Sequence, residues 1–185
     1  MIKRIFQDLD ECILHTLVNT IPTQDYVEFT LGEDKHTYRS IIRPCAKKLF
    51  AYYNKIVGKE NVYILTASTR DYAEALNRLG EFGLNPDHIL TREDIVKYSY
   101  KGAWSNDSTT IEHPLADKDN ILIDNLQWKY NMSKLLFLGI DVDNYYKTEE
   151  YYGVSFYDDP KEANFLKGIK KFISKIHNSA ATDIK

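Results

Sequence analysis

The chain has 185 residues, of which 43% are hydrophobic, so it is long enough for one well-buried domain and short for two. Its 24 basic and 27 acidic residues are well mixed and give a net charge of -3, which argues against binding a nucleic acid backbone. The N-terminal stretch has no long apolar segment, and no run of about 18 apolar residues occurs, so neither secretion nor membrane spanning is expected. We therefore expect a single cytoplasmic domain over residues 1–185, with no nucleic acid or membrane partner.

The first part of the chain predicts a strand, a hairpin and a helix. Residues 2–7 are an apolar-rich run that delivers Asp8 at its end, and open α/β sheets build their sites at the carboxyl ends of strands. Residues 25–42 alternate apolar and polar side chains on both sides of LGEDK, which indicates a β-hairpin. The segment RPCAKKLFAYYNKIVG then predicts an amphipathic helix that begins near Pro44 and ends at Gly58.

The rest of the chain alternates strands and helices. NVYILTAS (61–68) predicts a second buried strand, followed by the amphipathic helix TRDYAEALNRLGEFG, and HIL (88–90) predicts a short strand. Residues 97–120 are polar without a clear period and indicate a long surface loop. NILIDN (120–125) repeats the apolar run that ends in Asp, and GVSFYDDPKEANFLKGIKKFISKI predicts a short strand, a turn and a helix. This order is typical of an α/β sandwich with a largely parallel sheet and an inserted hairpin.

Three predicted strands end in Asp8, Thr66 and Asp124, which a parallel sheet would bring to one edge. A carboxylate such as Asp8 can attack phosphorus to form an aspartyl phosphate. A second carboxyl two residues on, Asp10, can protonate the leaving oxygen and later activate water. Neighbouring carboxylates repel one another unless a cation lies between them, and Mg²⁺ prefers such hard oxygen ligands. The pattern therefore predicts Mg²⁺-assisted phosphoryl chemistry.

The same motifs resemble the haloacid dehalogenase superfamily, and within it the carboxy-terminal-domain phosphatases that include the NIF-like proteins. DLDECILHT is similar to that branch's DLDETLVHS signature, which implies Asp8 as the nucleophile and Asp10 as the general acid/base. ILTAS is similar to the second motif, with Thr66 as the phosphate-binding hydroxyl. ILIDN is similar to the last motif, and the implied metal site consists of Asp8, Asp10, Asp124 and Asn125.

The resemblance extends beyond the motifs and covers most of the chain. VEFTL...YRSIIRPCAKKLF resembles the branch's hairpin insert (about 25–42) and the helix that follows it. TASTRDYAEAL and LTRED resemble segments near the substrate, which implies that Ala67, Tyr72 and Arg92 bind it; packing for Tyr72 and a solvated charge for Arg92 remain the alternatives. The implied fold is a Rossmannoid three-layer sandwich with a central mostly parallel sheet and no large cap domain.

The sequence departs from the branch pattern at three points. Gln7 stands where an apolar strand residue is usual, and Cys12 replaces the signature threonine, which weakens a hydrogen bond. The lysine of the third motif is the third departure, because the loop over 97–120 is longer than expected. We expect Lys101 in this role, with Lys97 and Lys118 as alternatives.

The resemblance implies a Mg²⁺-dependent phosphomonoester hydrolase that acts on phosphoserine or phosphothreonine in a protein. One alternative is a small-molecule phosphatase such as a 5'-nucleotidase, with the loop over 97–120 as a partial lid. A second alternative is a phosphopeptide-binding scaffold without turnover, against which the presence of both Asp8 and Asp10 argues.

Overall fold

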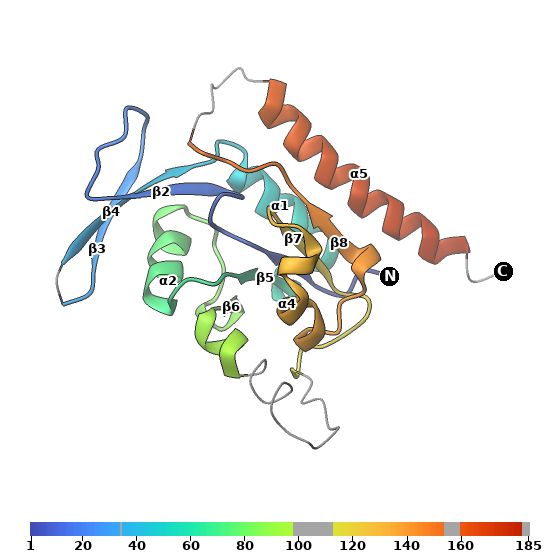
Figure 1. The fold of residues 1–185 in the computed structure, drawn as a ribbon. Coiled ribbons are helices and arrows are strands. Elements are labelled where there is room, and N and C mark those ends of the chain that lie inside the picture. Colours follow the sequence, from blue (N-terminus) through green and yellow to red (C-terminus); the bar gives the residue numbers. More distant parts are fainter. Residues whose placement is uncertain (34, 98–112, 154–159, 183–185) are drawn as a thin grey trace.

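The computed structural model describes residues 1–33, 35–97, 113–153 and 160–182, and its centre is a five-stranded sheet (Figure 1). All neighbouring strands of this sheet run parallel, in the order β6-β5-β1-β7-β8. The strands are β1 (Ile5–Gln7), β5 (Val62–Leu65), β6 (Ile89–Leu90), β7 (Ile121–Asp124) and β8 (Tyr145–Lys147). The predicted parallel sheet is confirmed.

Alternate residues of the central strands face two different helical layers. Ile5 and Ile64 pack in one apolar cluster with α1 (Ala46–Val57), α2 (Arg70–Leu79) and α5 (Pro160–Thr182). Phe6 and Leu122 pack in a second cluster with α4 (Met132–Phe137) and with Ile95 of the helical residues 92–97. The period of two along each strand therefore produces the predicted three-layer sandwich.

A smaller antiparallel sheet follows β1 and projects from the sandwich (Figure 1). The predicted hairpin is present as β3 (Val27–Leu31) and β4 (His36–Ile42). A third strand, β2 (Leu14–Val18), pairs with the other side of β4, so the order is β2-β4-β3. The sequence pattern predicts only two of these strands, because β2 follows Asp10 after a single turn and has no Gly or Pro to mark its start. We call this unit the insert sheet.

The C-terminal third contains elements that the sequence pattern does not predict. Helix α4 and strand β8 lie between β7 and the predicted closing helix, which is confirmed as α5. The short strand expected at GVSFY falls largely on residues 154–159, and most of the loop expected over 97–120 falls on residues 98–112; both segments lie outside the described residues. Across the described helices, none is long and apolar enough to cross a membrane.

A buried ion pair connects α5 to the loop before α1. The Arg43 Nε donates to Glu162 Oε1 at 2.8 Å, its Nη1 donates to the Cys12 carbonyl at 2.9 Å, and its guanidinium lies 3.6 Å from the Phe165 ring centroid. Arg43 is only 5% exposed. Removing one partner of a buried pair leaves the other charge uncompensated, which costs about 3–5 kcal/mol.

We therefore expect Glu162→Ala to lower the free energy of unfolding by about 3–5 kcal/mol, measured by urea denaturation. The matched control is Glu81→Ala, which removes the exposed ion pair of Glu81 with Lys47. Exposed pairs contribute little, so the control should keep the wild-type midpoint. Equal losses in the two variants would contradict a special role for the Arg43 ion pair.

Candidate active site

Carboxylates from neighbouring strands meet at the carboxyl edge of the central sheet. Gln7 pairs in register with Ile64 of β5 and with Ile123 of β7, so the residues that follow lie level with one another. These are Asp8 and Asp124, and the Asp8 N–H donates to the Ile123 carbonyl at 2.9 Å. Asp8 is 7% exposed and Asp124 is fully buried. The register of the sheet therefore brings these two acids together, as the sequence pattern predicts.

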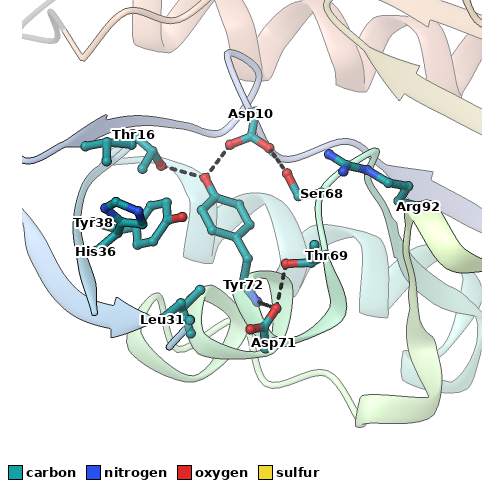
Figure 2. Close-up of a pocket in the computed structure, with 12 residues that line it drawn as sticks. Asp10, Thr16, Leu31, His36, Tyr38, Ser68, Thr69, Asp71, Tyr72 and Arg92 are labelled. Atoms are coloured by element: carbon teal, nitrogen blue, oxygen red, sulfur yellow. Dashed lines mark hydrogen bonds between the residues drawn. The ribbon is translucent and has the colours of Figure 1, made fainter. Parts of the chain in front are cut away.

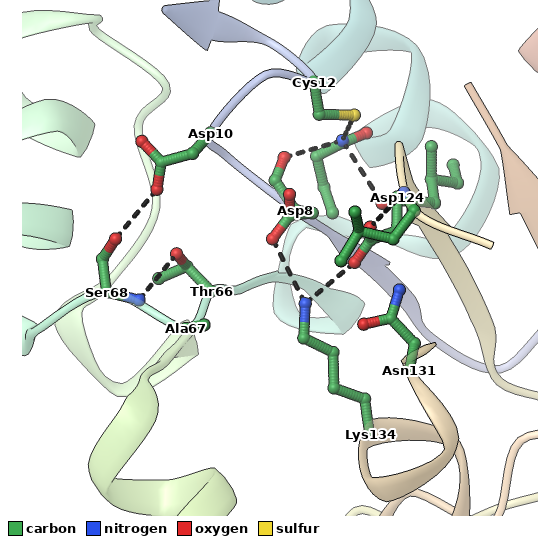
Figure 3. A network of polar contacts seen from close by, with 12 residues as sticks. Asp8, Asp10, Cys12, Thr66, Ala67, Ser68, Asp124, Asn131 and Lys134 are labelled. Carbon is green, nitrogen blue, oxygen red and sulfur yellow. Dashed lines mark hydrogen bonds and ion pairs between the residues drawn. The ribbon is translucent and has the colours of Figure 1, made fainter. Parts of the chain in front are cut away.

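A lysine from α4 lies between the two acids (Figure 3). The Lys134 Nζ is 2.8 Å from Asp124 Oδ2 and 3.3 Å from Asp8 Oδ1, and the residue is 6% exposed. Asp124 Oδ1 also accepts from the Leu126 N–H at 2.9 Å, which fixes the carboxylate at the turn after β7. Lys134 was not among the lysines expected from the sequence. Its signal is a lysine directly before the apolar run LLFL, in which Leu135 and Phe137 of α4 pack against the sheet.

Burial and charge act in opposite directions on this group of residues. Burial raises the pKa of Asp8 from its ordinary 3.8 to about 7, against the attraction of Lys134 and with the help of Asp124. Burial disfavours the Lys134 ammonium, yet the two carboxylates raise the pKa of Lys134 above its usual value. The lysine is therefore charged at neutral pH and supplies the positive charge between the acids.

Residues after β5 line the same edge. Thr66 is 1% exposed, and its Oγ1 accepts from the Ser68 N–H at 3.1 Å. Ala67 is exposed, and its carbonyl accepts from the Arg92 Nε at 2.8 Å. The Arg92 N–H also donates to the Ser68 carbonyl at 3.0 Å, so the segment after β6 is fastened to the segment after β5. The expected Thr66, Ala67 and Arg92 are thereby brought together.

Asp10 follows the bend after β1, and its carboxylate is turned away from the Lys134 group. Ser68 Oγ donates to Asp10 Oδ2 at 2.8 Å, and Tyr72 Oη donates to Asp10 Oδ1 at 2.5 Å. Asp8 points toward Lys134, whereas Asp10 points toward Ser68 (Figure 3). The two acids of the D-L-D sequence therefore have different polar environments, as a nucleophile and a proton donor require.

A groove of about 590 Å³ begins at Asp10 and extends between the insert sheet and α2 (Figure 2). Tyr72 and Arg92, which were expected beside the substrate, both line it, together with Tyr38 of the insert sheet. Tyr72 is 7% exposed, and its ring packs against Phe29 and Tyr38 with both centroid distances at 5.8 Å. The groove therefore connects Asp10 with the aromatic rings of Tyr38 and Tyr72.

None of the three lysines considered from the sequence is seen to contact Asp8 in the described part of the chain. Lys101 lies outside the described residues. Lys118 is exposed and precedes β7, so it lies toward the amino end of that strand, at the opposite edge from Asp124. Lys97 is exposed at the end of the helical residues 92–97. Of the lysines in the described part of the chain, Lys134 is the one that contacts Asp8.

The two departures Gln7 and Cys12 contact each other. The Gln7 Nε2 donates to Cys12 Sγ at 3.0 Å and to the Asp8 carbonyl at 2.8 Å, while Gln7 Oε1 accepts from the Tyr53 hydroxyl at 2.7 Å. Cys12 Sγ also lies 3.4 Å from the Thr148 hydroxyl. Burial raises the pKa of the Cys12 thiol well above its usual value, so the thiol stays protonated. Gln7 and Cys12 are thus hydrogen-bonded to each other next to Asp8.

We expect Gln7→Leu to lower the free energy of unfolding by about 1–3 kcal/mol, because the Tyr53 hydroxyl would lose its buried acceptor. Adding Tyr53→Phe removes that orphaned group, so the double variant should recover most of the loss in a urea double-mutant cycle. Additive losses from the two substitutions would contradict this coupling.

The residues at the sheet edge fit a magnesium ion. In the described part of the chain, no three His, Cys, Asp or Glu side chains are grouped to hold a metal by themselves. Mg²⁺ usually takes only one or two carboxylates and completes its shell with phosphate and water. Asp8 and Asp124 both reach one ammonium nitrogen, so one cation can contact both. Asn125, which is 6% exposed, follows directly.

Comparisons with known proteins identify the family of the chain. The family model of the NLI interacting factor-like phosphatases matches residues 3–185, whereas comparison with curated proteins gave no significant match. Among solved structures, the chain is similar to Fcp1, an essential RNA polymerase II CTD phosphatase, with a TM-score of 0.53 and 16% identity over 95% of this chain and 49% of that one.

A structure of the fission yeast enzyme Fcp1 bound to beryllium fluoride has a TM-score of 0.52 and 15% identity, over 98% of this chain and 56% of that one. The chain thus spans about half the length of both solved structures, and identities this low support the fold alone. The family model, in contrast, covers nearly the whole sequence, including every motif at the sheet edge. The chain belongs to the NLI interacting factor-like phosphatase family, in the haloacid dehalogenase superfamily.

Proposed function

We propose that the chain is a Mg²⁺-dependent phosphomonoesterase that forms an aspartyl phosphate on Asp8, and that its substrates are phosphoserine or phosphothreonine residues of proteins. The observation that carries this proposal is the group of Asp8, Asp124 and Lys134, with two acids on one buried ammonium beside a separately held Asp10. A phosphate that enters this edge meets a nucleophile, a cation and a proton donor.

In the first half of the reaction, an Asp8 carboxylate oxygen attacks phosphorus while the bond from phosphorus to the serine or threonine oxygen breaks. Asp10 gives its proton to that leaving oxygen, so the product is a neutral alcohol. In the second half, water attacks the phosphorus of the aspartyl phosphate and Asp10 takes a proton from it. Inorganic phosphate leaves, and the Asp8 carboxylate is restored.

An ammonium group and a hydroxyl group near Asp8 stabilise the phosphoryl oxygens. We assign this role to Lys134, because it contacts Asp8 from the buried side, and to the Thr66 hydroxyl at the neighbouring strand end. Of the four expected metal ligands, Asp8, Asp124 and Asn125 would hold Mg²⁺, which when bound neutralises charge shared by phosphate and carboxylates. Both carboxylate oxygens of the fourth, Asp10, accept from Ser68 and Tyr72 instead. Lys101 was expected from the sequence to bind the phosphate. Substituting Lys101 and Lys134 separately therefore tests this assignment.

The groove supports a protein substrate over a small one. It offers about 590 Å³ beside Asp10, with Tyr38 and Tyr72 on its aromatic side and Arg92 at its polar side. Residues that flank a phosphoserine can lie there while the phosphate reaches Asp8. A nucleoside monophosphate also carries an aromatic group, so it is the appropriate competitor for the test.

The test compares phosphate release from phosphoserine and phosphothreonine peptides with release from nucleoside monophosphates, in Mg²⁺ and in EDTA. We expect turnover of the peptides, weaker turnover of the nucleotides, and loss of both in EDTA. No phosphate release from any substrate would leave a phosphopeptide-binding scaffold as the better description, and faster release from nucleotides would favour a small-molecule phosphatase.

A further inference from the structure

Both carboxylate oxygens of Asp10 accept a hydrogen bond from a hydroxyl group, one on the segment after β5 and one on α2. Ser68 Oγ contacts Oδ2 at 2.8 Å and Tyr72 Oη contacts Oδ1 at 2.5 Å (Figure 2). Two bonds to two oxygens fix the rotation of the carboxylate as well as its position. The orientation of Asp10 therefore depends on side chains outside the D-L-D sequence.

The contact through Tyr72 continues into the insert sheet. The Thr16 Oγ1 lies 2.7 Å from Tyr72 Oη and 2.7 Å from Ser40 Oγ. The Tyr72 hydroxyl has one proton, which it donates to Asp10, so it accepts from Thr16. The Thr16 proton is then used as well, so Thr16 accepts from Ser40. The hydrogen bonds form one directed chain that begins on β4 and ends at Asp10.

Ser40, Thr16 and Tyr72 make up this hydroxyl chain. Its Ser40 end is buried, whereas its Tyr72 end, next to Asp10, lines the groove. Ser40, on β4 of the insert sheet, is fully buried. Thr16, Tyr72 and Asp10 line the groove, so a group that enters the groove meets the chain directly. Burial and the charge of Asp10 raise the pKa of Tyr72, so its phenol keeps the proton that it donates.

We propose that Tyr72 is a positioning residue for Asp10 and that the hydroxyl chain makes the insert sheet part of the proton-transfer apparatus. This inference rests on the proposed function, in which Asp10 protonates the leaving oxygen. A tyrosine that only packed in the groove would need its ring, which contacts Phe29 and Tyr38, but not its hydroxyl. The hydroxyl is thus the group to remove.

Substrates whose leaving groups differ in basicity show whether the proton donor is correctly oriented. The alkoxide of serine is a strong base and must be protonated as it leaves, whereas p-nitrophenolate is a weak base that leaves without a proton. A loss of Asp10 orientation should therefore slow transfer of the phosphoryl group to Asp8 from phosphoserine peptides but not from p-nitrophenyl phosphate. The later attack of water on the aspartyl phosphate is common to both substrates, whereas kcat/KM reports only the steps up to departure of the leaving group. A loss of folding would slow both substrates alike, and a lost contact with the peptide would raise its KM instead of lowering its kcat.

The experiment measures kcat and KM of Tyr72→Phe on both substrates in Mg²⁺. We expect kcat/KM on a phosphoserine peptide to fall by about 10–100-fold through kcat, with KM nearly unchanged, and kcat/KM on p-nitrophenyl phosphate to fall by less than about 3-fold. Thr16→Val breaks the hydroxyl chain one step earlier and should cause a smaller change of the same kind. The control Tyr52→Phe removes a tyrosine hydroxyl on α1, outside the groove, and should match the wild type.

The outcomes separate this inference from the proposed function. If Asp10→Asn loses turnover of phosphoserine while both Tyr72→Phe and Thr16→Val keep the wild-type ratio between the two substrates, the positioning role is overturned and the proposed function stands. A raised KM with unchanged kcat in Tyr72→Phe would also overturn it, since Tyr72 would then only contact substrate. If Asp10→Asn keeps full turnover of phosphoserine, both proposals fall. If Tyr72→Phe does not fold, Thr16→Val decides the question by the same ratio.

Discussion

Asp8→Asn should abolish turnover, by about 10⁴-fold or more, and should make the metal-free protein more stable at neutral and alkaline pH. The amide has nearly the shape of the carboxylate but cannot form the aspartyl phosphate. It also removes a charge that the buried site disfavours. Turnover is measured as phosphate release, and stability as the melting temperature in EDTA from pH 4.5 to pH 8.

The direction of the pH effect follows from the raised pKa of Asp8. Its folded-state pKa of about 7 lies above its ordinary 3.8, so the stability gained from the neutral form is present below about pH 4 and is lost as the pH rises through 7. The interval corresponds to about 4 kcal/mol at about 1.4 kcal/mol per pH unit. The amide of Asp8→Asn does not ionise, so the variant does not lose this stability. The difference between its melting temperature and that of the wild type should therefore grow between pH 4.5 and pH 8.

The control for this prediction is Asp87→Asn, because Asp87 is an exposed aspartate in the short helix Pro86–His88. It should match the wild type in turnover and in the pH dependence of melting. A nucleophile other than Asp8 would be indicated by unchanged turnover in Asp8→Asn. A melting advantage that stays constant between pH 4.5 and pH 8 would mean that Asp8 is ionised in the folded state across the whole range.

The sequence predicted the carboxyl edge of the sheet because its residues depend on strand order alone. Asp8, Thr66 and Asp124 each follow a run of apolar residues, and parallel strands bring such ends together whatever the loops do. Local periodicity is enough for these three residues. Ala67 and Arg92 were implied by the family resemblance instead. Each lies two residues after the end of its strand, and the Arg92 Nε donates to the Ala67 carbonyl.

Lys134 and β2 were not predicted because their roles depend on contacts distant in sequence. Helix α4 has only six residues, too few for a clear helical period, and a lysine beside apolar residues usually extends to solvent. Strand β2 is defined by its pairing with β4, which a turn after Asp10 makes possible. The contact between Gln7 and Cys12 is a further case, because each residue alone resembles a simple departure from the family signature.

The lysine assignment can be tested because Lys134 neutralises two buried acids. Lys134→Met keeps the length of the side chain, removes the ammonium and leaves Asp8 and Asp124 facing each other without a cation. Removing one partner of a buried charged group costs about 3–5 kcal/mol, so the variant should melt at a lower temperature in EDTA. With Mg²⁺, turnover should fall by about 10²–10³-fold, because the phosphoryl oxygens lose a fixed charge.

Magnesium should separate the structural effect of Lys134 from its catalytic effect. A divalent cation between Asp8 and Asp124 replaces the missing positive charge, so Mg²⁺ should raise the melting temperature of Lys134→Met more than that of the wild type. Turnover should remain low, since the lysine's contact with the phosphoryl group is still absent. Lys118→Met, at the exposed loop before β7, is the matched control and should be unaffected. If Lys101→Met abolished turnover while Lys134→Met retained it, the phosphate-binding lysine would be Lys101, and Lys134 would serve only to hold the two acids together.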